Sequence, residues 1–201
     1  MRVLKFNEFV GEGLWSKGIV RSKTGDERLE KKVTFNINDI KPVDLGGDVL
    51  IADIDLTING EEEITWEELQ DIKRQIEKTG WRIPDWDEIR FLFHKDKHLP
   101  PKMRDDITVH TKDENGGVIV YVQSQKTKET VTFPLDNPYG CFYWCEYTSE
   151  DMKRLEKENR VPNTGRVMRV NDPKYSYYEA LITFANADKK EKGKVRLIKR
   201  K

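Results

Sequence analysis

Two helix-start signals flank a short segment that constrains the fold of this chain more than any other stretch. Thr65 and Asp85 each stand three residues before a glutamate. This is the spacing of a capping box, in which the first side chain bonds the backbone of the glutamate and the glutamate bonds back. Apolar residues then recur at helical spacing, so the pattern predicts helices that begin at Trp66 and Trp86. Gly80 is placed to end the first helix, because glycine adopts the left-handed conformation at little cost.

The segment between these helices, residues 80–84, predicts a buried connection. Trp81 and Ile83 supply the apolar side chains that can enter the core, on either side of Arg82. Pro84 biases the residue before it toward extended backbone. Downstream, residues 118–122 and 130–133 are rich in β-branched and aromatic residues, and a polar loop separates them. They predict an antiparallel hairpin.

Residues 80–84, read as glycine-tryptophan-arginine-aliphatic-proline before an acid-capped helix, resemble the signature of a known domain. It is the C-type-lectin-like domain of the Fibrobacter succinogenes major paralogous domain family, whose superfamily also holds formylglycine-generating-enzyme-like proteins and variable proteins of diversity-generating retroelements. Residues 43–52, 139–144, and 178–184 with 195–198 resemble its opening strand, central aromatic strand and closing strand pair. The resemblance implies an α+β, C-type-lectin-like fold: two helices on a small, mostly antiparallel sheet, with a long loop region. It gives structural roles to Gly80, Trp81, Arg82, Pro84, Trp144 and Arg196.

Composition narrows the class of protein. Lys plus Arg and Asp plus Glu both total 36, so no molecule-wide basic field argues for nucleic-acid binding. No apolar run approaches the length that crosses a bilayer, and the first residues lack the apolar core of a signal peptide. We therefore expect a soluble protein, cytoplasmic in the producing cell. Basic residues crowd the end and favour a solvated hairpin and edge strand, with an anionic partner as the alternative. They are Lys189, Lys190, Lys192, Lys194, Arg196, Lys199, Arg200 and Lys201.

Residues 1–40 differ from the rest, and we interpret them as an extended arm before a single domain, residues 41–201. From residue 15 to 32 the arm is polar and aperiodic and can bury little. Its aromatic residues Phe6, Phe9 and Trp15 are candidates for docking on a protein partner or a larger assembly. Residues 6–12 resemble the targeting peptides of proteins packaged in tailed-phage heads, which are cut after a glutamate, here Glu12. That resemblance implies a virion-associated protein; an ordinary docking segment is the alternative.

Metal chemistry finds little support in the sequence. His94 and His98 lie near a helix end that runs into proline, without an obvious third ligand, so we expect a solvated helix end. Cys141 and Cys145 lie in a predicted strand, where about 3.3 Å per residue separates them too far for a disulfide, so we expect free thiols. The formylglycine-generating branch implies copper between two cysteines. The spacing here differs from that pair by one residue, which turns a strand side chain to the other face.

Calcium-dependent sugar binding is also disfavoured. In the position of the lectin glutamate-proline-asparagine triplet, residues 161–163 have a valine where the acid would stand. Asn186 and Asp188 follow the next strand without the lectin tryptophan. Calcium wants six to eight oxygen ligands, and a lost carboxylate removes both a ligand and a charge. We expect a turn at residues 162–165, and no metal, cofactor or catalytic residue.

The resemblance places the contact surface on the long connection between the central and closing strands, residues 147–177. Within it, residues 150–157 predict a short helix, and several side chains are of types common at recognition hot spots. The candidates are Tyr147, Arg166, Arg169, Tyr175 and Tyr177. We thus expect a non-enzymatic binding or structural module, virion-associated, that contacts a protein or a glycan; homo-oligomerisation stays open. A soluble bacterial ligand-binding module is the alternative, and a copper-dependent oxidase the remote one.

Overall fold

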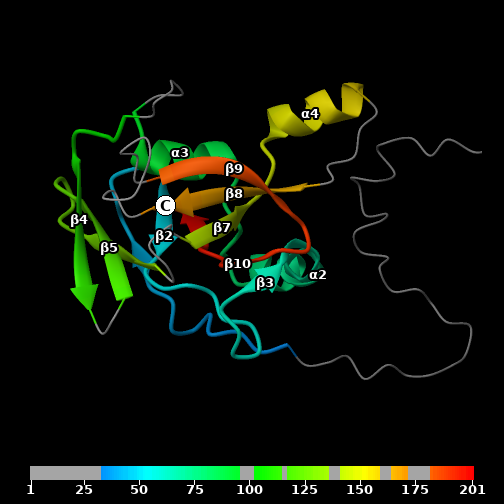
Figure 1. Ribbon diagram of the computed structural model, residues 1–201, viewed down its shortest axis with the longest axis horizontal. Coiled ribbons are helices and arrows are strands. Elements are labelled where there is room, and N and C mark those ends of the chain that lie inside the picture. Colours follow the sequence, from blue (N-terminus) through cyan, green and yellow to red (C-terminus); the bar gives the residue numbers. More distant parts are fainter. Residues whose placement is uncertain (1–32, 96–101, 115–116, 136–140, 159–163, 172–181) are drawn as a thin grey trace, which may run out of the picture.

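The computed structural model describes residues 33–95, 102–114, 117–135, 141–158, 164–171 and 182–201 (Figure 1). These residues form an α+β structure of three helices and several small antiparallel sheets. The helices are α2 (Trp66–Glu77), α3 (Trp86–Phe93) and α4 (Ser149–Lys157). The α+β class and the antiparallel pairing agree with the sequence prediction. The prediction of two helices on one small sheet was too simple.

The strands of the described chain fall into four sheets. One has the order β1-β2-β11, one pairs β10 with β3, one has the order β4-β5-β6, and one has the order β7-β8-β9. Their bounds, in chain order, are β1 Pro42–Val43, β2 Val49–Ala52, β3 Ile64–Thr65, β4 Ile107–Glu114, β5 Gly117–Ser124, β6 Thr130–Leu135, β7 Cys141–Cys145, β8 Thr164–Val170, β9 Ile182–Asp188, β10 Lys192–Gly193 and β11 Ile198–Arg200.

The capping predictions are confirmed at both helices. The Glu68 backbone N–H donates to Thr65 Oγ1, and the Glu68 carboxylate accepts from the Thr65 backbone at 2.8 Å. Asp85 and Glu88 make the same reciprocal pair, at 2.8 and 3.0 Å. Gly80 has the predicted left-handed conformation, with a φ of +83°, but it lies two residues past the C-cap of α2, which is Lys78.

Residues 81–84 pack in the core or bond to neighbouring elements. Trp81 is buried, and the backbone of Arg82 exchanges two 2.9 Å hydrogen bonds with Ile198 of β11. The Arg82 guanidinium pairs with Glu88. The Pro84 carbonyl accepts from the backbone of Glu146, just after β7. The connection at residues 80–84 therefore ties both helices to the central strands.

Strand β7 separates two apolar clusters because its side chains alternate across the sheet. Cys141, Tyr143 and Cys145 belong to the cluster shared with α3 and the β4-β5-β6 sheet. Trp144 belongs to the cluster shared with α2, where its ring lies 5.4 Å from that of Trp66. The fold therefore has a core on each face of β7.

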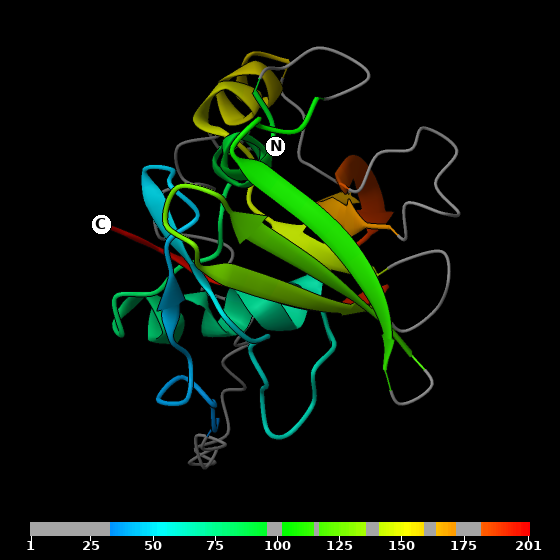
Figure 2. The same cartoon turned by 90° about the vertical axis from the view of Figure 1, so that its left-hand side faces the viewer.

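The predicted hairpin at residues 118–122 and 130–133 is confirmed as β5 and β6. The sequence analysis missed β4, which pairs along its length with β5 and is drawn face on in Figure 2. Ile107 is buried and Val109 partly buried, whereas His110 and Lys112 are exposed. Because one face of this edge strand is polar and exposed, its sequence contains few apolar residues that would indicate a strand.

The structure differs most from the prediction at residues 147–177, which were interpreted as an irregular connection. Residues 147–177 contain α4, close to its predicted position, and also the seven-residue strand β8. Thr164 and Gly165 begin that strand, so the turn predicted at 162–165 is wrong for them, and Arg166 and Arg169 lie on a strand. Val167, Met168 and Val170 are the apolar residues of β8, but Val167 and Met168 are adjacent, so the strand lacks the alternation that marks a half-buried strand.

Two expectations of solvation were also wrong. His94 is only 2% exposed, at the end of α3 where the chain turns back to pair with Met103. Lys194 and Arg196 are buried in the basic end. Arg196 is accommodated by an ion pair with Asp55 at 2.6 Å and by carbonyl acceptors. These are the carbonyls of Ala52, Asp53 and Thr132.

Several predictions fall outside the described residues: the arm positions Phe6, Phe9, Glu12 and Trp15, the loop tyrosines Tyr175 and Tyr177, and His98. The last part of the predicted arm is described. Ile40 is buried, and Val33, Phe35 and Ile37 pack against the cluster that holds Trp144. In the described part of the chain, no helix has the length and apolar character needed to cross a membrane.

Candidate functional site

A hollow of about 570 Å³ lies between α3 and α4, and we call it the α3–α4 hollow. Both helices lie in the upper part of the molecule in each view (Figures 1 and 2). The residues that line the hollow come from these two helices and the turn before α4. They are Trp86, Asp87, Arg90, Thr148, Glu150, Asp151, Lys153, Arg154 and Lys157.

Helix α4 is a surface helix held by few contacts. Thr148 caps it, because its hydroxyl accepts from the Asp151 backbone N–H at 3.0 Å. None of its residues is buried, so it cannot be held mainly by apolar packing. Asp151 reaches the sheet instead, where its Oδ1 lies 3.2 Å from Nη2 of Arg166 on β8. This ion pair links α4 to the body.

Arg166 is the centre of the site. Its Cζ lies 3.8 Å from the centroid of the Trp86 ring and 5.2 Å from that of Tyr147. Its Nη1 donates to Asn186 Oδ1 on β9 at 2.8 Å. Its side chain is 12% exposed. Arginine stacks on aromatic faces and is the residue that best recognises oxyanions, so this placement suits binding rather than simple solvation.

The hollow has an excess of positive charge. Its lining has four basic and three acidic residues, and Arg166 behind it adds a fifth cation, which leaves two unmatched positive charges. Lys153 and Lys157 are exposed, and Arg154 is 61% exposed. Because the whole chain has a formal net charge of +0, this is a local field, which attracts anionic groups at short range.

The structure brings together only some of the predicted site residues. Tyr147 and Arg166 meet, as described. Arg169 is exposed on the opposite face of β8 from Arg166, because the two stand three positions apart on a strand. The sequence analysis missed Trp86 and Asp151 as site residues. It assigned Trp86 to the core of α3, and no sequence signal shows that α4 folds back toward that ring.

The positions considered for metals have other partners. Asn186 Oδ1 accepts from the Arg166 guanidinium, and Asp188 Oδ1 accepts from the backbone of Lys190. Cys141 and Cys145 are buried free thiols, as predicted, and burial raises the pKa of Cys145. No three His, Cys, Asp or Glu side chains gather into a metal-binding group within the described ranges.

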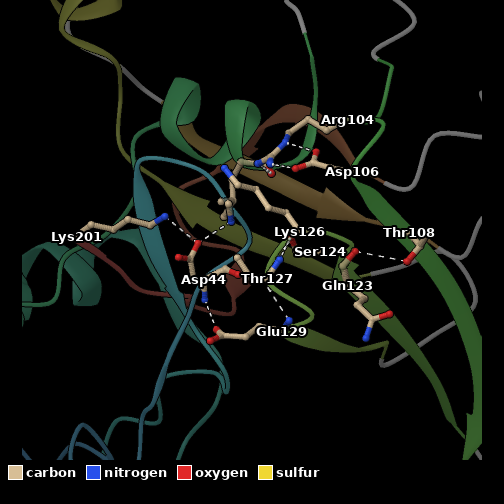
Figure 3. Close-up of polar contacts among 12 residues, drawn as sticks. Asp44, Arg104, Asp106, Thr108, Gln123, Ser124, Lys126, Thr127, Glu129 and Lys201 are labelled. Carbon is tan, nitrogen blue, oxygen red and sulfur yellow. Dashed lines mark hydrogen bonds and ion pairs between the residues drawn. The ribbon is translucent and has the colours of Figure 1, made fainter.

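A second polar cluster joins three distant segments (Figure 3). The Asp44 carboxylate accepts from the Gly46 backbone at 2.6 Å and pairs with Lys201 at 2.8 Å. The Asp44 carbonyl accepts from the Thr127 hydroxyl, in the turn after β5. The Lys201 ammonium lowers the pKa of Asp44. These polar groups serve as hydrogen-bond and ion-pair partners for one another. They hold the loop at Asp44 against the β5–β6 hairpin, so we interpret the cluster as structural.

Comparisons of the chain with protein-family models, with curated proteins and with solved structures gave no match.

Proposed function

We propose that this chain is a non-enzymatic binding module with a C-type-lectin-like fold, and that it binds an acidic segment of a protein partner at the α3–α4 hollow. The observation that carries the proposal is the stack of Arg166 on Trp86 beneath a surface with excess positive charge. Trp, Tyr and Arg are the residues enriched at interface hot spots, and all three types meet here.

An exposed aromatic residue lies on α3, one helical turn after Asp87 of the lining. Phe91 is 46% exposed and follows Arg90 of the lining on α3. Among the described residues, it is one of two large hydrophobic side chains with this degree of exposure. Apolar side chains rimmed by polar ones mark contact sites for proteins. A partner segment with both acidic and apolar residues would fit this combination.

A glycan is the second candidate ligand, and one observation makes it less favourable. Sugar rings bind to tryptophan by lying on its face. The Arg166 guanidinium already covers one face of Trp86 at 3.8 Å. The charged side chains on the rim of the hollow remain available for recognition, which favours an acidic peptide over a neutral sugar.

The test is fluorescence anisotropy with a labelled hexaglutamate peptide, and hexaglutamine as the uncharged comparison. The variant Lys153→Glu/Arg154→Glu/Lys157→Glu reverses three charges on exposed positions of α4. We expect it to weaken hexaglutamate binding about tenfold or more, since each lost contact contributes a few tenths to 1 kcal/mol.

The matched control is Lys41→Glu/Lys126→Glu/Lys190→Glu, which makes the same change of net charge at exposed positions elsewhere. The proposal requires this variant to keep most of the affinity. If both variants lose the same affinity for hexaglutamate, binding depends on net charge alone. If the wild-type protein does not bind hexaglutamate, the proposal is contradicted.

The arm carries a separate part of the proposed function. We propose that residues 1–40 attach the module to a larger particle, and that the arm is cut after Glu12, on the strength of the sequence resemblance. Mass spectrometry of purified native particles tests this. The proposal predicts a chain that begins at Gly13 in the particle fraction. An intact amino terminus confined to the cytosolic fraction would contradict it.

A further inference from the structure

On one edge of the Arg166 guanidinium, only one of the two nitrogen donors has an acceptor in the described part of the chain. The Nε and Nη2 atoms lie on the same edge of an arginine and can bind both oxygens of one carboxylate. Here Nη2 pairs with Asp151 at 3.2 Å, while Nε is buried and donates to no acceptor among the described residues. An unsatisfied buried donor costs about 1–3 kcal/mol. The edge therefore has capacity for a better-placed oxyanion than the one it holds.

Asp151 has a second partner to which it can move. Its Oδ1 lies 3.0 Å from Nη2 of Arg154, one turn along α4, while Arg154 is 61% exposed. A rotation of the Asp151 side chain toward Arg154 would break the pair with Arg166 and keep the Asp151 charge matched. The Asp151 side chain is 16% exposed, and none of the residues of α4 is fully buried.

We propose that Arg166 is an oxyanion-binding residue whose Nε–Nη2 edge receives a carboxylate of the partner's acidic segment, and that Asp151 occupies this position in the absence of the partner. On binding, Asp151 pairs with Arg154 alone, and the incoming carboxylate bonds both Nε and Nη2. The inference rests on the proposed function, and adds to it the atoms that recognise the ligand and an internal competitor.

Two substitutions separate this inference from a purely structural role for the pair. Asp151→Asn keeps the size of the side chain and removes the competing charge, so hexaglutamate should bind about three- to tenfold more tightly. Arg166→Lys keeps the charge but cannot bind a carboxylate through two parallel hydrogen bonds, so binding should weaken about tenfold. If the pair served only to hold α4 in place, both substitutions would weaken binding.

The experiment is isothermal titration calorimetry of full-length wild type and both variants with hexaglutamate, with circular dichroism melts to confirm folding. Tighter binding by Asp151→Asn with weaker binding by Arg166→Lys supports the inference. Equal or weaker binding by Asp151→Asn overturns it. The proposed function would still stand in that case if the triple reversal on α4 weakens binding about tenfold or more and the matched control variant does not.

A measurement on the wild-type protein covers the case in which a variant fails to fold. The ¹⁵N–¹H signal of Arg166 Nε should move downfield when hexaglutamate is added, because a carboxylate then accepts from it. An unchanged Arg166 Nε signal at saturating hexaglutamate overturns the inference whatever the variants do.

Discussion

Gly165 at the start of β8 lies so close to the Trp144 ring that a Cβ atom at residue 165 would stand 2.3 Å from Cζ3 of the indole. Trp144 cannot easily withdraw, since it is fully buried and its Nε1 donates to the Ile64 carbonyl at 2.8 Å. The glycine therefore sets the distance between β8 and the cluster packed on α2.

Replacing Gly165 with alanine should lower the free energy of unfolding by about 1–3 kcal/mol, as expected for overpacking. Urea denaturation measures the change. In the background Trp144→Leu, which makes room, the same alanine should cost clearly less. Independent, additive effects of the two substitutions would show that the contact is not the cause.

The buried pair of Arg196 and Asp55 yields a second prediction. Burial raises the pKa of Asp55, although Arg196 beside it acts in the opposite direction. Asp55→Ala leaves the guanidinium buried without its counter-ion, so the free energy of unfolding at neutral pH should fall by about 3–5 kcal/mol. The exposed Asp39→Ala should stay within about 0.5 kcal/mol of wild type. If denaturant melts show equally small changes in the free energy of unfolding for Asp55→Ala and Asp39→Ala, Arg196 does not need Asp55 as a partner.

Asp44 should contribute to the loss of folding stability at acidic pH. Its hydrogen bond with Lys201 lowers its pKa in the folded protein below the ordinary aspartate value of about 3.9. A lowered pKa means that the contribution to stability is complete above that value and is lost as pH falls through the folded pKa. Asp44→Asn should therefore reduce the dependence of stability on pH below about 4, with melts between pH 2 and 6 as the check. An unchanged acid slope would contradict this assignment.

The local parts of the fold could be predicted because their causes lie within a few residues of each other. The capping pairs of Thr65 and Asp85, the left-handed Gly80 and the hairpin of β5 and β6 depend on short spacings. Arg196 and His94 misled the sequence analysis because their burial depends on partners or turns elsewhere. Asp55, which neutralises Arg196, is far away in the chain and carries no signal of that role.

The site was predicted only in part for the same reason. Tyr147 and Arg166 stand out as residue types, but their meeting with Trp86 requires β8 to pair with β7 and α3 to pack across it. The face of β8 that Arg166 occupies depends on strand register. A segment interpreted as a loop has no register, so Arg169 could not be separated from Arg166.

The tryptophan indole signals in a ¹⁵N–¹H spectrum report directly on whether the α3–α4 hollow binds acidic protein segments. The chain has five tryptophans, and among the described ones only Trp86 lines the hollow. Addition of hexaglutamate should shift the Trp86 indole N–H in a saturable way and leave those of Trp66, Trp81 and Trp144 in place. A Trp86 signal that does not move at saturating peptide would contradict the account.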